Sequence, residues 1–156
     1  MSRPRGITRF AITIAIATSV LAACSGDDKD KALELAREAC NMEFPDVSGD
    51  PLTDAAARQD SRDKILPRMD KAADKAAQAA RLDDTWQPLA TAFNNTAELV
   101  SVTLELGDLR ETKIGPGYSS PDDVDKDNRL SEQHTALSNN LNNPTVEGEC
   151  RKTTGS

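Results

Sequence analysis

The sequence predicts an all-α protein, a small antiparallel bundle of about four helices. Its apolar residues are mainly Ala, Leu, Val and Ile, and only 3% of the chain is aromatic, a composition that suits packed helices better than a β-sandwich. Apolar residues also recur at helical spacing in several segments, with capping residues and prolines between them. With 156 residues, the chain has room for one small domain.

The first helix is predicted over residues 31–40. Leu33, Ala36 and Cys40 follow each other at i, i+3 and i+7, so they share one face of a helix. Several aspartates just before this segment offer N-caps. Residues 44–51 contain two prolines and a glycine, and we expect them to end the helix.

The second helical segment is predicted over residues 52–82. Its apolar stripe keeps a helical period, while the charged residues fall off that stripe. Pro67 lies inside the segment, and because proline lacks an N–H and clashes with the preceding turn, we expect a kink or break just before it. The stripe consists of Ile65, Met69, Ala72 or Ala73, Ala76 and Ala80.

The third helix is predicted to be the central one, because its segment is the most apolar of the mature chain. Asp84 and Gln87 have the spacing of a capping box, and Pro88 falls in the first turn. The β-branched residues 100–103 could also form a strand, but the length and unbroken period favour a helix. Gly107 and residues 115–117 indicate a loop after it. The seam consists of Trp86, Ala90, Phe93, Ala97, Val100 and Leu104, widened by Leu89, Leu99 and Leu106.

The last helix is predicted to begin at Ser120, an N-cap followed by Pro121 and two acidic residues. Residues 142–144, which are Asn-Asn-Pro, end it. Its apolar face consists of Val124, Leu130 or Ser131, His134, Leu137 and Leu141.

Residues 1–23 have the pattern of an export signal. Three arginines precede an apolar run over residues 10–20, which is too short to span a bilayer and has the usual length of a signal-peptide core. The following residues, Leu21-Ala22-Ala23-Cys24, resemble the lipobox of bacterial lipoproteins. The alternatives are a plain secretory signal with a chance cysteine, or an uncleaved anchor helix.

The lipoprotein resemblance implies that the leader is removed, that Cys24 carries a diacylglycerol, and that the protein is held outside the cell membrane. Two or three acyl chains hold a protein stably on a bilayer, whereas one does not. The resemblance covers only residues 1–24. We therefore divide the chain into a signal peptide (1–23), a polar tether (24–30) and a helical domain (31–156).

Cys40 and Cys150 remain if Cys24 is lipidated. An even pair of cysteines in an oxidising compartment predicts a disulfide. Free thiols and a metal pair are the alternatives, although two sulfurs and a single histidine make a poor zinc site. In the chain-entropy model a bridge closing a loop of about 100 residues contributes about 4.7 kcal/mol.

The charge of the chain argues against nucleic acid as a partner. The formal net charge is -7, and loss of the three arginines of the leader makes it -10. Such a surface repels phosphate backbones and anionic lipid headgroups alike. We therefore expect attachment to a membrane to come from the lipid anchor.

Asp123, Asp125 and Asp127 are a weak calcium candidate. They occupy positions 1, 3 and 5 of a loop that partly resembles an EF-hand. Position 12, however, is His134 rather than the expected glutamate, and no helical segment precedes the loop. An acid-rich helix start, stabilised by the helix dipole, explains the pattern better.

No catalytic arrangement stands out, so we expect no enzymatic activity and no cofactor. His134, the single histidine, is expected to pack in or near the core, and no serine lies in a nucleophile turn. Trp86 is expected in the core and Tyr118, in a loop, at an exposed contact; both residue types are common at binding hot spots.

The sequence therefore predicts a lipid-anchored envelope protein that acts as a non-enzymatic interaction module, with an envelope or phage protein as its partner. One alternative is an exclusion or immunity lipoprotein of the prophage type, which blocks a phage or toxin. Another is a small-ligand or metal-binding envelope protein.

Overall fold

The computed structural model describes residues 26–113 and 120–154, which are helical apart from their connections and contain no β-strand. Cys24, Tyr118 and the predicted signal peptide lie outside these residues. The prediction of an all-α bundle is confirmed. The helices are α1 (Gly26–Cys40), α2 (Ala55–Asp60), α3 (Leu66–Leu82), α4 (Gln87–Lys113), α5 (Pro121–Asn140) and α6 (Val146–Lys152).

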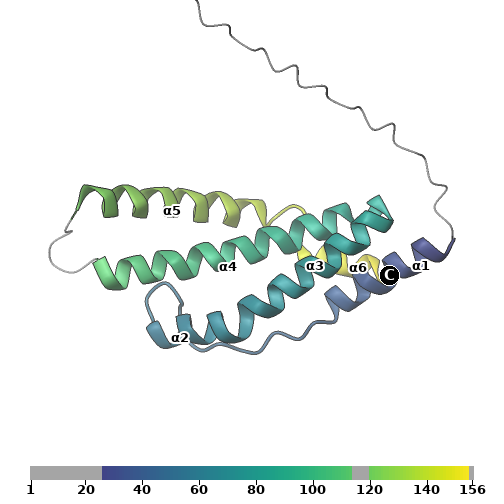
Figure 1. The fold of residues 1–156 in the computed structure, drawn as a ribbon, viewed down its shortest axis with the longest axis horizontal. Coiled ribbons are helices and arrows are strands. Elements are labelled where there is room, and N and C mark those ends of the chain that lie inside the picture. The colour runs from purple at the N-terminus through teal and green to yellow at the C-terminus, as the bar shows by residue number, and fades with distance from the viewer. Residues whose placement is uncertain (1–25, 114–119, 155–156) are drawn as a thin grey trace, which may run out of the picture.

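The four long helices, α1, α3, α4 and α5, pack side by side in chain order and alternate in direction (Figure 1). α3 lies between α1 and α4, and α5 packs along the other side of α4. The short helix α6 contacts both α1 and α4. The predicted central position of the third segment is therefore confirmed, because α4 contacts nearly every other helix.

Two apolar clusters form the core of the described residues. The larger one joins α1, α3 and the first half of α4; it consists of Ala36, Ala39, Met69, Ala72, Ala73, Ala76, Ala79, Leu89, Ala90 and Phe93. Because most of these side chains are alanines, the helices can approach each other closely. The smaller cluster joins the second half of α4 to α5; it consists of Val102, Leu106, Leu109, Leu130 and Leu137.

α1 begins earlier than the sequence predicted. Residues 26–30, which the sequence assigns to a polar tether, form the first turn of this helix and the beginning of its second turn. Asp27 and Asp28 lie in the first turn, where negative charge interacts favourably with the dipole of the helix. The acidic residues that suggested a solvated linker therefore stabilise a helix end.

The predicted kink or break before Pro67 takes the form of a π-helical turn in a continuous helical path. A π-helical turn, Ser61–Ile65, joins α2 to α3, and the backbone N–H of Leu66 donates to the carbonyl of Ser61, five residues back. Pro67 has no N–H to donate to the carbonyl of Asp63, and its ring would clash with that carbonyl in a regular α-helix. The wider π-turn avoids this clash without ending the helical path.

The cap between α3 and α4 lies one residue earlier than predicted. Asp83, not Asp84, has extended backbone angles and caps a 3₁₀ turn, Asp84–Trp86. Its carboxylate accepts the backbone N–H of Thr85 at 3.0 Å and the Thr85 hydroxyl at 2.8 Å. These two hydrogen bonds, aided by Lys29 of α1, lower the pKa of Asp83.

Gly107 lies inside α4 rather than in the predicted loop. It is buried, and a Cβ atom there would lie 2.6 Å from the carbonyl oxygen of Pro51 and 2.8 Å from the side chain of Arg58. Glycine at this position is therefore a close-packing residue, not a helix breaker.

Candidate interaction surfaces

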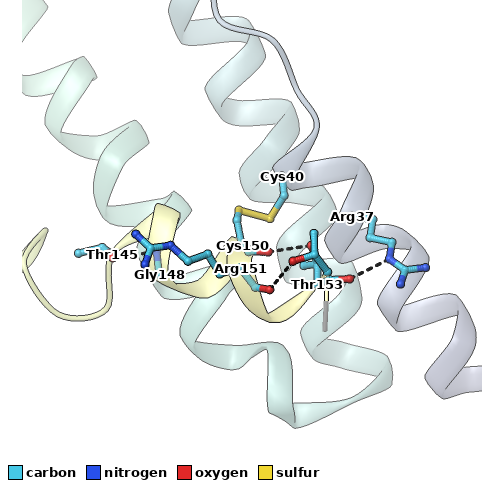
Figure 2. Close-up of a disulfide and its surroundings, with 8 residues drawn as sticks. Arg37, Cys40, Thr145, Gly148, Cys150, Arg151 and Thr153 are labelled. Carbon is cyan, nitrogen blue, oxygen red and sulfur yellow. Dashed lines mark hydrogen bonds between the residues drawn. A yellow bond between two sulfur atoms is a disulfide. The ribbon is translucent and has the colours of Figure 1, made fainter. Parts of the chain in front are cut away.

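Cys40 and Cys150 form the predicted disulfide (Figure 2). Cys40 is the last residue of α1 and Cys150 lies in α6, and their Cα atoms are 5.5 Å apart. The helix α6 was not predicted; Thr145 caps it by accepting the backbone N–H of Gly148 at 3.0 Å. The disulfide and this helix fasten the end of the described chain to α1.

A hydrogen bond beside the disulfide also joins α1 to the end of α6. The guanidinium Nε of Arg37 in α1 donates to the backbone carbonyl of Thr153 at 3.0 Å, as Figure 2 shows. Thr153 is buried, and its hydroxyl donates to the carbonyl of Cys150 at 2.8 Å. The α1–α6 contact therefore has both covalent and polar components.

An open hollow of about 640 Å³ lies beside the disulfide. Its wall includes Phe93, which is almost fully buried, and Phe44, which is 37% exposed. Half-buried Met42 and Val146 add apolar surface, and Arg151 adds a cation. The hollow is lined by Cys40, Asn41, Met42, Phe44, Phe93, Val146, Glu147, Cys150, Arg151, Thr153 and Thr154.

A buried arginine joins α2 to the second half of α4. The side chain of Arg58 is only 3% exposed. Its Nε donates to Asp108 at 2.9 Å, one terminal nitrogen donates to the carbonyl of Pro51 at 2.8 Å, and the other pairs with Glu111. The charge is therefore compensated by two carboxylates and a carbonyl, as burial requires.

A small apolar groove lies where the π-turn faces α4. Its volume is about 150 Å³, and apolar side chains contribute most of its surface. The π-turn contributes Ser61 and Ile65, the loop before α2 contributes Pro51, and α4 supplies the remaining residues. π-Turns within helices occur frequently at functional sites. The groove is lined by Pro51, Ser61, Ile65, Leu99, Val100, Thr103 and Leu104.

Of the predicted contact residues, Trp86 lies within the described part of the chain, and it lines neither the hollow nor the groove. Trp86 is half-buried at the start of α4, where it packs against the larger core cluster, in keeping with its predicted core position. Tyr118 and Cys24 lie outside the described residues. His134 is half-buried on α5, as expected.

The weak calcium candidate does not form a loop of the EF-hand kind. Asp123, Asp125 and Asp127 all lie within α5, and a continuous helix cannot wrap its carboxylates around one ion as an EF-hand loop does. Asp127 pairs with Arg110 at 2.8 Å, and Asp123 accepts the hydroxyl of Ser120 at 2.8 Å. The alternative reading of an acid-rich helix start is the correct one.

Among residues 26–113 and 120–154, no group of three or more His, Cys, Asp or Glu side chains could hold a metal ion. Nor does any helix in this part of the chain have the length and apolar character needed to cross a membrane.

Comparisons with protein-family models, with curated proteins and with solved structures found no match for this chain.

Proposed function

We propose that this protein is a lipoprotein of the bacterial cell envelope, anchored through Cys24, whose helical domain is a non-enzymatic protein-interaction module. In this proposal the apolar groove between the π-turn and α4 receives one apolar side chain of a partner protein.

The envelope location is supported by the leader and the disulfide together. The lipobox-like residues Leu21-Ala22-Ala23-Cys24 follow a short apolar run, and export would bring the domain into an oxidising compartment. Disulfides form and persist in such compartments and are rare in the cytosol of most bacteria. The Cys40–Cys150 bridge is what an exported chain with two remaining cysteines would form.

The groove is the single observation that carries the binding role. Its volume of about 150 Å³ is below the roughly 300–1,000 Å³ of most small-molecule sites. A cavity of this size accommodates a group about as large as benzene, which is the size of a leucine or phenylalanine side chain. Single apolar anchors in well-packed pockets often dominate protein–protein interfaces.

The anchor and the bridge are tested by the intact mass of protein extracted from its native membrane. We expect residues 24–156 plus an acylated glyceride, and a gain of two hydrogens after reduction. An unlipidated mass or an uncleaved chain would contradict the anchor.

The groove is tested by chemical crosslinking in the native membrane. We expect the wild type to give a specific crosslinked product that Val100→Arg loses, because the longer charged side chain would fill the groove. Val100 is half-buried, so the substitution leaves the two core clusters intact. Ala136→Arg, on the exposed outer face of α5, is the matched control and should keep the product. Equal products from both variants would exclude the groove as the contact.

Small-ligand binding is a second candidate, favoured by the hollow beside the disulfide. Its volume of about 640 Å³ falls within the usual range for ligand sites, and it combines aromatic side chains with a few polar groups. Native mass spectrometry of the purified mature protein should then show a retained molecule. Phe44→Asp, which places a charge on the apolar wall, should release it.

A further inference from the structure

α6 lies against α1 and α4, yet it adds little to the apolar core. Among the described residues, the buried members of the two apolar clusters belong to α1, α3, α4 and α5, and none belongs to α6. Val146 and Cys150 of α6 are only partly buried where they pack against the larger cluster. The four long helices can therefore keep their packing against each other when α6 is displaced.

Two ion pairs of α6 join residues of that helix to each other. Arg151 pairs with Glu147 at 2.5 Å, and Lys152 pairs with Glu149 at 2.6 Å. The side chain of Glu149 is 10% exposed, whereas that of Lys152 is 58% exposed, so a largely buried carboxylate depends on a solvated cation. Burial of a carboxylate costs free energy unless its pairing compensates fully, and this cost weakens the attachment of α6.

The disulfide and one hydrogen bond tie α6 to α1 (Figure 2). The bridge joins Cys150 to Cys40, and Arg37 donates to the carbonyl of Thr153, just after α6. Arg37 is exposed, so water competes for this hydrogen bond. α6 has seven residues, and a helix of that length does not persist alone in water. The covalent bridge is therefore the main attachment of α6.

The bridge lies at the open hollow, where a dissolved dithiol can approach it. Cys40 and Cys150 are both half-buried and line this hollow. α6 supplies part of the wall, and Phe93 of α4 lies in the same wall. Displacement of α6 would therefore open the hollow and uncover Phe93, which is only 1% exposed while α6 is in place.

We propose that α6 is a latch opened by reduction of the Cys40–Cys150 bridge. One thiolate of a dithiol attacks a bridge sulfur and forms a mixed disulfide. The second thiolate then displaces the cysteine, so that the dithiol becomes a cyclic disulfide and both cysteines become thiols. α6 then leaves α1 and α4 and unfolds, Phe93 is uncovered, and the long helices stay folded.

In the cell, the dithiol would come from a thiol–disulfide oxidoreductase of the envelope. The inference rests on the proposed envelope location at this point alone. The structural part of the latch depends on the bridge and on the contacts of α6, and it is tested on the isolated protein with dithiothreitol.

Hydrogen exchange read by mass spectrometry tests the latch on the mature protein extracted from its membrane. Amides are followed in peptides from α6, from the end of α1 and from the second half of α4, before and after reduction with dithiothreitol. We expect the α6 amides to lose their protection on reduction and those of α4 around Val102 to keep theirs. Reoxidation should restore the protection of α6.

Two variants separate the bridge from the hydrogen bond beside it. Cys40→Ser with Cys150→Ser should leave α6 unprotected without any reductant, and dithiothreitol should change nothing further. Arg37→Ala, the matched control, removes the hydrogen bond to Thr153 and keeps the bridge. In the oxidised Arg37→Ala protein, α6 should stay protected and should respond to dithiothreitol as the wild type does.

Two outcomes would overturn the latch. If α6 keeps its protection after reduction, packing holds this helix without the bridge. If α6 and the long helices lose their protection together, the bridge supports the whole bundle and α6 does not open by itself. The intact mass of the same samples reports the lipid on Cys24 separately, so an unlipidated mass contradicts the proposed anchor and not the latch.

Discussion

Arg58 is a buried residue on which we expect the contact between α2 and α4 to depend. Arg58→Ala should lower the free energy of unfolding by about 2 kcal/mol, because the packed side chain is lost and the Pro51 carbonyl loses its donor. Asp108 and Glu111 are 46% and 55% exposed, so water can solvate them and the loss stays below that of a fully buried pair. Urea denaturation measures the change.

Arg62 is the matched control for Arg58. It pairs with the same Asp108, at 2.6 Å, but its side chain is 41% exposed. Arg62→Ala should therefore cost less than about 1 kcal/mol. Equal losses from both variants would show that burial of Arg58 contributes nothing beyond its ion pairs.

Whether Gly107→Ala raises or lowers stability depends on the packing around residue 107. Alanine is favoured over glycine inside a helix by about 1 kcal/mol, but here the added methyl group would lie 2.6 Å from the Pro51 carbonyl oxygen. Gly107→Ala should therefore lower the urea midpoint, since backbone and a buried arginine must move. Gly26→Ala, which meets no atom within 4 Å, should leave it unchanged or raise it. A stabilised Gly107→Ala would mean that the Pro51 loop moves easily.

The sequence identified residues whose type or immediate neighbours indicate a role, and it missed residues whose role depends on contacts with distant parts of the chain. The Cys40–Cys150 pair follows from counting cysteines, and the cap at Ser120 follows from its neighbours. Arg58 looks like an ordinary surface residue because its partners Asp108 and Glu111 are about fifty positions away. Gly107 indicates a loop in the sequence, because nothing nearby in the chain reveals the approach of Pro51.

At the scale of elements, the sequence predicted the long helices better than their ends. The helical periods of α3, α4 and α5 are long enough to be clear in the sequence. The start of α1 at Gly26 was missed because aspartates are favourable both in linkers and in a first helical turn. α6 was missed because its seven residues are too few to show a period, and the disulfide holds them in place. The groove could not be predicted, because three separate segments form it.

α5 should be the least protected of the long helices. Only Leu130 and Leu137 on it are buried, and many of its contacts with α4 are polar pairs such as Lys126–Glu105 and Gln133–Glu98. Elements with few buried apolar contacts open at a lower free energy than the whole protein. Native-state hydrogen exchange should therefore show α5 amides exchanging at lower denaturant than those of α3. Exchange of both helices at the global free energy of unfolding would contradict this expectation.

At the scale of the whole molecule, different interactions stabilise the two ends of the helical bundle. The alanine-rich cluster and the disulfide stabilise the part formed by α1, α3, α6 and the start of α4. The other part depends on a smaller leucine and valine cluster and on Arg58. α4 runs through both, so a partner bound at the groove would contact the helix that connects them.

The disulfide gives the largest predicted effect on stability. Cys40 and Cys150 are 110 positions apart, and in the chain-entropy model a bridge closing a loop of about 100 residues contributes about 4.7 kcal/mol by restricting the unfolded chain. Replacing both cysteines by serine should therefore lower the free energy of unfolding in urea by about 3–5 kcal/mol. A thiol reductant should destabilise the wild type by a similar amount and leave the double variant unchanged. If the variant unfolded at the same urea concentration as the oxidised wild type, the stability of this alanine-rich domain would come from helix packing alone.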